Sequence, residues 1–189
     1  MRAPFAALIV CVAFSAVTEP AFASFHFWLP DEAFSNASGT IQFLEFSDPF
    51  DGEQFLTLTS LHSNANTFPF SSDLPSSFTA GKYFLVGTAA FAALPGAPAP
   101  DYIIPANFFS TTADNLFLDG SVRSPLTFSA GLLPTDGIHS LSFDGNSLST
   151  SINSPTNFAG ATTSIPEPST GLLVLTGLLG LAARRRWCA

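Results

Sequence analysis

The sequence predicts an all-β fold, a single antiparallel β-sandwich. Two observations lead to this prediction: short segments in which apolar and polar residues alternate, and Asp-Gly turns that separate them. No strongly amphipathic helix interrupts the pattern, as a mixed fold would require. The chain has 189 residues, enough for one domain of ordinary size.

The first element expected along the chain is a signal helix. Arg2 supplies a positive start, and residues 5–17 form an apolar stretch of signal-peptide length. Ala21 and Ala23 place small side chains at the third and first positions before a cleavage site, so we expect cleavage after Ala23 and a mature chain that starts at Ser24. The alternative is an uncleaved membrane anchor, for which the apolar stretch is short.

The strands follow, each recognised by its period-2 pattern or by a short apolar run. The run at 82–86 is continuous and predicts a central strand, and 141–148 reads as a hairpin across Asp144-Gly145. Residues 88–94 are expected to form a short helix. The remaining predicted strands are 41–46, 55–59, 116–118, 126–128 and 139–143. Further Asp-Gly turns stand at 51–52, 119–120 and 136–137.

The charge of this central region excludes some partners. Between Ser24 and Ile165 the only basic residues, histidine aside, are Lys82 and Arg123, so the region is strongly acidic. Such a surface repels phosphate backbones and anionic lipid heads, and we expect no nucleic-acid partner. Both cysteines, Cys11 and Cys188, lie in the terminal segments, which leaves no disulfide or cysteine metal site in the body. The 21 phenylalanines imply a well-filled core or exposed apolar faces.

Candidate catalytic and metal-binding residues are few. The three histidines have no spacing typical of zinc ligands, and we expect neither a metal nor a cofactor. Residues 136–140 contain the residue types of a catalytic triad, but their contiguity favours a turn followed by a strand.

Two acidic groups leave alternatives open. Asp48, Asp51 and Glu53 could supply oxygen ligands to calcium, although their spacing is not that of an EF-hand, and turn chemistry explains them more simply. Glu32 and Glu45 could form a carboxylate pair for glycoside hydrolysis.

The C-terminal segment has three parts in a fixed order. Pro166, Glu167 and Pro168 come first, an uncharged Gly/Leu-rich helix of 171–183 follows, and Arg184, Arg185 and Arg186 end it. The helix is slightly short for a membrane span, and the arginines indicate the cytoplasmic side. This arrangement resembles the PEP-CTERM sorting signal of exported proteins in Gram-negative bacteria. The resemblance implies recognition by a membrane-embedded exosortase, removal of the helix, and delivery to the cell surface or an exopolysaccharide matrix.

A second resemblance concerns the body. Residues 31–33, 43–46, 68–70 and 81–86 follow the order of motifs in the lamin-tail domain, with Asp31 at the usual Asn position and Phe43 at the expected Trp position. This resemblance implies an immunoglobulin-like β-sandwich that serves as a surface or binding module.

These observations define the expected organisation. We expect a signal peptide at 1–23, a β-sandwich at 24–150, a flexible spacer at 151–164 and a PEP-CTERM sorting signal with a transmembrane helix at 165–189. The expected function is that of a non-enzymatic surface or matrix protein, processed by signal peptidase and an exosortase, held at the inner membrane before the second cut. Exopolysaccharide or other matrix components are its expected partners. The alternative is a secreted hydrolase with an unrecognised site.

Overall fold

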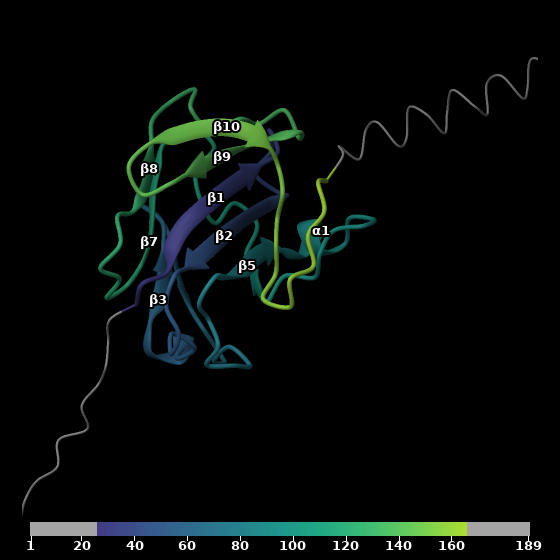
Figure 1. Ribbon diagram of the computed structural model, residues 1–189. Coiled ribbons are helices and arrows are strands. Elements are labelled where there is room, and N and C mark those ends of the chain that lie inside the picture. Colours follow the sequence, from purple (N-terminus) through teal and green to yellow (C-terminus); the bar gives the residue numbers. More distant parts are fainter. Residues whose placement is uncertain (1–25, 166–189) are drawn as a thin grey trace, which may run out of the picture.

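The computed structural model describes residues 26–165, which form two β-sheets (Figure 1). One sheet has six strands in the order β10-β9-β1-β2-β5-β6, and the other has four in the order β4-β3-β7-β8. The larger sheet consists of β1 (Leu29–Ser35), β2 (Gln42–Asp48), β5 (Lys82–Thr88), β6 (Tyr102–Ile104), β9 (His139–Phe143) and β10 (Leu148–Ile152). The smaller sheet consists of β3 (Ser60–His62), β4 (Thr67–Pro69), β7 (Asp114–Leu118) and β8 (Leu126–Phe128).

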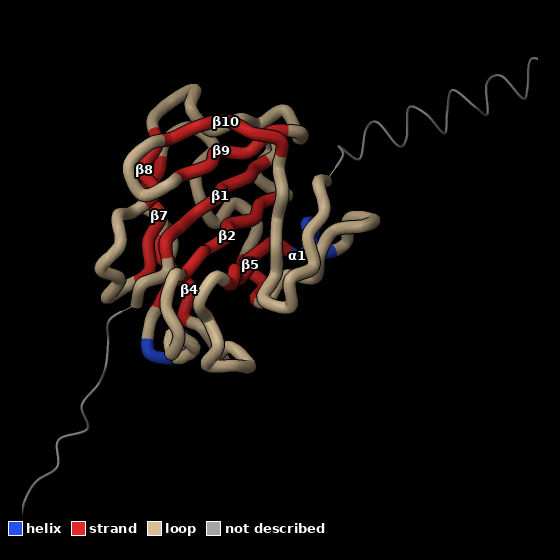
Figure 2. The backbone as a smooth tube through the Cα atoms, viewed as in Figure 1, coloured by secondary structure: helices blue, strands red, loops and turns tan. Residues whose placement is uncertain are grey.

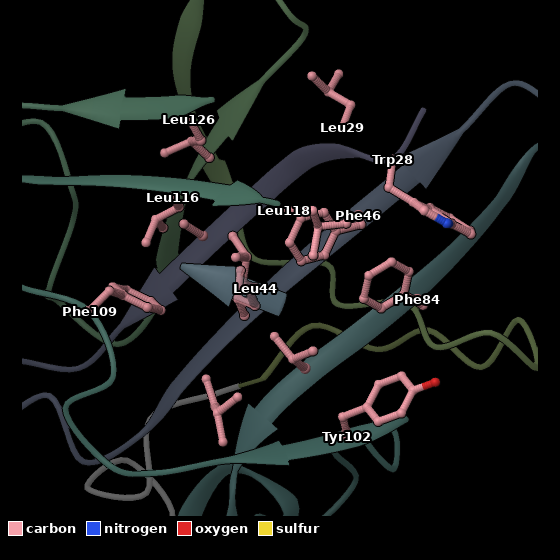
Figure 3. Packing of buried hydrophobic residues seen from close by; sticks show 14 of the residues in the cluster. Trp28, Leu29, Leu44, Phe46, Phe84, Tyr102, Phe109, Leu116, Leu118 and Leu126 are labelled. Atoms are coloured by element: carbon pink, nitrogen blue, oxygen red, sulfur yellow. The ribbon is translucent and has the colours of Figure 1, made fainter. Parts of the chain in front are cut away.

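Apolar side chains from both sheets meet in one buried cluster (Figure 3). Leu44 of β2 and Phe84 of β5 come from the larger sheet, while Leu61, Leu116 and Leu126 come from the smaller one, and all five are fully buried. Alternate residues of a strand point to opposite faces, so each strand can supply this core from one face only. The predicted mostly-β architecture is confirmed, with two sheets that share a core in a sandwich-like arrangement.

An aromatic group fills one end of this core. The rings of Trp28 and Phe84 meet edge to face at 4.7 Å, and Phe46 stacks on Phe84 at 4.6 Å. Trp28 is fully buried, and its Nε1–H donates to the carbonyl oxygen of Glu53 at 2.8 Å. A buried indole N–H needs such a partner. Much of the high phenylalanine content therefore serves the core, as the composition suggests.

Most of the predicted strands are confirmed. β8 and β9 have the predicted bounds, β5 and β7 extend theirs by two residues, and β2 starts one residue later and ends two residues later than predicted. β5 lies inside the sheet between β2 and β6, as a central strand should. β9 and β10 form the predicted hairpin, and Gly145 in its turn has a φ of +94°, a conformation that few other residues adopt.

The strand predicted at 55–59 is wrong. Leu56–Leu58 forms a single turn of 3₁₀ helix, and β3 begins only at Ser60. The backbone N–H of Thr57 in this turn donates to the carboxylate of Asp73 at 2.9 Å and not to a neighbouring strand. Leu56 is fully buried while Phe55 and Leu58 are about half exposed, so the apolar residues do not line one face as the alternation suggests.

The sheet is not entirely antiparallel, because β5 and β6 pair in parallel. Parallel neighbours need a crossover connection, and here α1 (Ala89–Ala92) lies within it. This helix confirms the short helix predicted at 88–94. The side-chain oxygen of Thr88 accepts a hydrogen bond from the N–H of Phe91 at 3.2 Å and so caps its start.

The segment that follows β10 differs from the flexible spacer predicted at 151–164. β10 continues to Ile152, and the chain then passes over the outer face of the larger sheet toward α1 (Figure 2). Asn153, Phe158 and Ile165 are all at least 94% buried. The sequence looks like a spacer because Ser, Thr, Asn and Gly dominate it, yet its polar groups are satisfied by the domain.

The residues predicted for sorting and for signal cleavage lie outside the described part of the chain. They are Ala21, Ala23, Ser24, Pro166, Glu167, Pro168, Arg184, Arg185 and Arg186. Within residues 26–165, no helix has the length and apolar character needed to cross a bilayer.

Candidate functional site beneath the C-terminal segment

Three carboxylates, two of them buried and one partly buried, lie on the outer face of the larger sheet. Glu32 of β1 stands directly opposite Glu45 of β2 in the antiparallel register, so their side chains share one face. Asp101, immediately before β6, accepts a hydrogen bond from the N–H of Leu85 in β5 at 2.8 Å. Glu32 and Glu45 are each only 3% exposed, an unusual state for carboxylates.

The segment 153–165 covers these carboxylates with its backbone amides. The N–H of Ser154 donates to Glu32 at 2.9 Å, and the Ser154 hydroxyl donates to the other oxygen of the same carboxylate at 3.1 Å. The N–H of Thr156 donates to Glu45 in the same way. Two residues further on, the N–H of Phe158 donates to Asp101 at 2.9 Å. Alternate amides of an extended chain point the same way, which explains the period of two.

The end of the segment is held by one asparagine. The side chain of Asn153 donates to the carbonyl oxygen of Ile165 at 3.0 Å, and its own oxygen accepts from the N–H of Ile165 at 2.6 Å. The Ile165 side chain packs into a small apolar cluster with Phe43 of β2, Leu85 of β5 and Phe91 of α1. Residues 153–165 are called the clamp below. The clamp is held by its amide hydrogen bonds to the carboxylates and by the attachment of Ile165.

Burial controls the charge of these carboxylates. Removal from water, and then the negative charge of Glu32, raise the pKa of Glu45 to about 9, although hydrogen bonds from Thr156 oppose the change. Desolvation likewise raises the pKa of Glu32, of Asp31 and of Asp101. Burial therefore favours the neutral form of Glu45, which can accept the hydrogen bond from Thr156 without placing a second negative charge beside Glu32.

The predicted carboxylate pair is thus brought together, but it is closed to solvent. Glu32 and Glu45 lie under the clamp, and neither lines the apolar groove beside Ile103, the polar hollow beside Arg123 or the hollow beside Asn107. Glycoside hydrolysis needs a sugar between the two carboxyl groups. In this arrangement their position suits attachment of the clamp.

The residues of the triad-like stretch do not converge into a catalytic arrangement. His139 Nδ1 lies 2.6 Å from the Asp136 carboxylate, and both side chains are about half exposed. Ser140 is fully buried, and as the next residue along the strand it points to the opposite face from His139. The favoured interpretation, a turn followed by a strand, is confirmed by β9 and by the φ of +79° at Gly137.

The acidic loop considered for calcium divides its carboxylates among separate partners. Asp48 accepts from the N–H of Phe50 at 2.9 Å, and Asp51 accepts from the N–H of Ala80 at 3.0 Å. Glu53 lies 3.3 Å from the ring of His26. Among residues 26–165, no three His, Cys, Asp or Glu side chains gather closely enough to hold a metal ion. The contact of Asp48 is a local turn hydrogen bond, while Asp51 and Glu53 contact residues far away in the sequence.

Sequence reasoning missed most of the clamp. Glu32 and Glu45 were candidates, but Asp101, Asn153 and the amides that bind the carboxylates gave no recognisable pattern. Asn and Ser in a polar stretch are equally common in linkers. A period of two in backbone donors leaves no trace in the sequence, because every residue except proline carries the same N–H.

Comparison with known proteins gave one match. Residues 164–186 match the family model for the PEP-CTERM protein-sorting motif, while no curated protein and no solved structure matched the chain. The resemblance to the lamin-tail domain therefore stays a prediction. The matched motif begins with Ser164 and Ile165, the last two residues of the clamp. The C-terminal segment thus carries a PEP-CTERM protein-sorting motif, which supports sorting of this chain to the cell exterior by an exosortase.

Proposed function

We propose that this chain is a non-enzymatic surface or extracellular-matrix protein of a Gram-negative bacterium. The observation that carries the proposal is the sorting motif at residues 164–186. In this account signal peptidase cuts after Ala23, and the apolar tail then anchors the chain in the inner membrane. An exosortase then cuts near Pro166–Pro168 and releases the domain toward the exterior.

Exposed aromatic side chains support a binding role for the domain. Phe78 is 74% exposed, and Phe50 and Phe55 are about half exposed. They stand on two loops, 49–59 and 70–81, which are tied together by a hydrogen bond from Gly52 N–H to the carbonyl oxygen of Ser77 at 2.8 Å. Exposed apolar groups on neighbouring loops are typical of contact surfaces. We name the two loops the aromatic end, and matrix exopolysaccharide is its proposed ligand.

The lamin-tail resemblance supports the same class of function. Its motifs at 31–33, 43–46 and 81–86 fall on β1, β2 and β5, which are neighbours in the larger sheet. An immunoglobulin-like sandwich offers its end loops for binding, which agrees with the position of the aromatic end.

Two measurements test the proposal. Intact mass of the protein from the cell surface and medium should give a chain that starts at Ser24 and ends near Pro168. A membrane-bound product that keeps Cys188 would contradict exosortase processing.

Binding to extracted exopolysaccharide tests the role of the domain. The double variant F50A/F78A should bind at least about tenfold more weakly, since each stacking side chain contributes on the order of 1 kcal/mol. The control is Ile152→Ala, which removes a 63% exposed apolar side chain from the edge strand β10. Equal binding by all three proteins would exclude the aromatic end as the contact surface.

A secreted hydrolase is the alternative, and one observation favours it. Glu32 and Glu45 are paired carboxyl groups with raised pKa values, a state typical of catalytic acids. Hydrolysis would require the clamp to leave them. Glycosidase activity in the processed chain that disappears in Glu45→Gln would support the alternative, and an inactive processed chain would exclude it for the substrates assayed.

A further inference from the structure

The sorting motif starts inside the folded domain, without a linker. Ile165 immediately precedes Pro166, and its side chain is 3% exposed. Both of its backbone polar groups are hydrogen-bonded to the Asn153 side chain, at 2.6 and 3.0 Å. No residue between the domain and Pro-Glu-Pro is therefore free to adopt another conformation while the clamp is closed.

A protease needs a substrate segment whose backbone groups are unpaired and accessible. Proteins that bind a peptide in an extended form pair with its backbone groups. The backbone groups of Ile165 are already occupied by Asn153, and its side chain is enclosed by Phe43, Leu85 and Phe91. A protease embedded in the membrane must also reach the chain next to a folded domain, which occupies the adjacent space.

The clamp is built in a way that lets it open alone. It contributes no strand to either sheet. Its first amide, that of Asn153, donates to the carbonyl oxygen of Ile138 beside β9 at 3.0 Å. Beyond that point, the hydrogen bonds from its amides to the larger sheet end on acidic side chains, those of Glu32, Glu45 and Asp101. Few apolar side chains anchor it, chiefly Phe158 and Ile165. Segments with few buried apolar contacts open without global unfolding.

We propose that residues 153–165 hold the entry to the sorting motif closed on the folded domain, and that exosortase-type cleavage proceeds through molecules in which this clamp has opened. The inference rests on the proposed processing by an exosortase. Cleavage is then limited by the population of the open clamp, and the new end of the chain returns to the domain surface after the cut.

Two variants of the full-length chain test this in cells that process it. Asn153→Ala removes the hydrogen bonds to Ile165 and lies outside the matched motif. A flexible Gly/Ser spacer inserted between Ile165 and Pro166 instead frees the motif while the clamp stays closed. The control is Asn66→Ala, which loses side-chain hydrogen bonds to the carbonyl oxygens of Asn107 and Phe108, far from the clamp in sequence.

The rate at which the processed chain appears in a pulse-chase experiment is the readout. We expect both variants to be processed about tenfold faster than the wild type and the control, a factor that corresponds to about 1.4 kcal/mol. Hydrogen exchange of the precursor should show faster exchange at Ser154, Thr156 and Phe158 in Asn153→Ala, with β2 unchanged. Exchange that also rises in β2 would show global destabilisation by Asn153→Ala. In that case the processing rate of the spacer variant alone tests the proposal.

The possible failures are distinct. If all chains are processed at the same rate, or the two variants more slowly, the clamp does not limit cleavage and this inference is overturned while exosortase processing stands. If no chain is processed and Cys188 is kept in each, the proposed processing is overturned together with the inference.

Discussion

Glu45 gives the sharpest test of the buried carboxylates. Glu45→Gln keeps a side-chain carbonyl oxygen that accepts from the N–H of Thr156, but it removes the ionisable group. Glu45 is buried in the fold and exposed in the unfolded chain, so its pKa rises from 4.5 to about 9 on folding. A carboxyl group with a raised pKa binds a proton more tightly in the folded state. The contribution of this group to the free energy of unfolding is therefore fully present below pH 4.5 and is lost as the pH rises toward 9.

The size of the effect follows from this window. Each pH unit between the two pKa values lowers the free energy of unfolding by at most about 1.4 kcal/mol. Between pH 7 and pH 9 the wild type should lose up to about 3 kcal/mol through this group. Burial raises the pKa of Asp48 only to about 6, so its share of the pH dependence is over by pH 7. Glu45→Gln should therefore have a shallower profile than the wild type in this range, and the raised pKa values of Glu32, Asp31 and Asp101 account for any slope that remains.

The assay is denaturant unfolding of the full-length chain in detergent at several pH values. Trp28 is fully buried and reports on unfolding by its fluorescence, in a Trp187→Phe background that leaves it the only tryptophan. Asp119→Asn is the matched control, since it removes a negative charge from a side chain that is 72% exposed. The control should keep the slope of the wild type.

One result would refute the reasoning. If Glu45→Gln loses stability between pH 7 and pH 9 as steeply as the wild type, then Glu45 is ionised in the folded protein. The clamp would in that case be held by a charged carboxylate.

Two further predictions concern packing and the exposed turn. A Cβ at Gly87 would lie 2.6 Å from a ring carbon of Phe91, so Gly87→Ala should lower the free energy of unfolding by about 1–3 kcal/mol, and an unchanged midpoint in urea would contradict this. Against a desolvation cost, hydrogen bonds from His139 and Ile138 lower the pKa of Asp136 from 3.8 to about 2, so its contribution to stability is present above pH 4 and lost as the pH falls toward 2. Asp136→Asn should flatten the acid limb of the stability profile below pH 4, as measured by acid titration of the unfolding midpoint.

Strands with a strong local pattern could be predicted, even the three-residue β8, while strands that depend on distant contacts could not. The apolar run of β5 and the Asp-Gly turn after β9 identify their elements because period and turn chemistry act over a few residues. β6 could not be found, since a three-residue strand pairs in parallel only after the crossover through α1 has brought it there. The 55–59 prediction was wrong, and the turn found there contacts Asp73, sixteen residues away from Thr57, which a local pattern does not reveal.

The residues of the candidate site could likewise be predicted only in part. Glu32 and Glu45 were named as a possible carboxylate pair, but only Glu45 lay in a predicted strand, because β1 was not predicted. Their direct pairing depends on the register of β1 and β2, which shifts at an irregularity between Pro30 and Glu32. Nothing local shows that the amides of Ser154 and Thr156, more than a hundred residues further along the chain, satisfy these carboxylates.

The sequence by itself determined the sorting motif of the protein and the class of its fold. A sorting motif is read by other proteins as a linear order of residues, and a strand pattern reflects a period of two, so both are visible in one dimension. Only the tertiary structure decided that residues 153–165 are a clamp and that Ile165 is buried at the entry to the motif. The reason is physical: a polar segment has no preferred partner of its own, and its conformation depends on the carboxylates and the apolar cluster that folding brings beneath it.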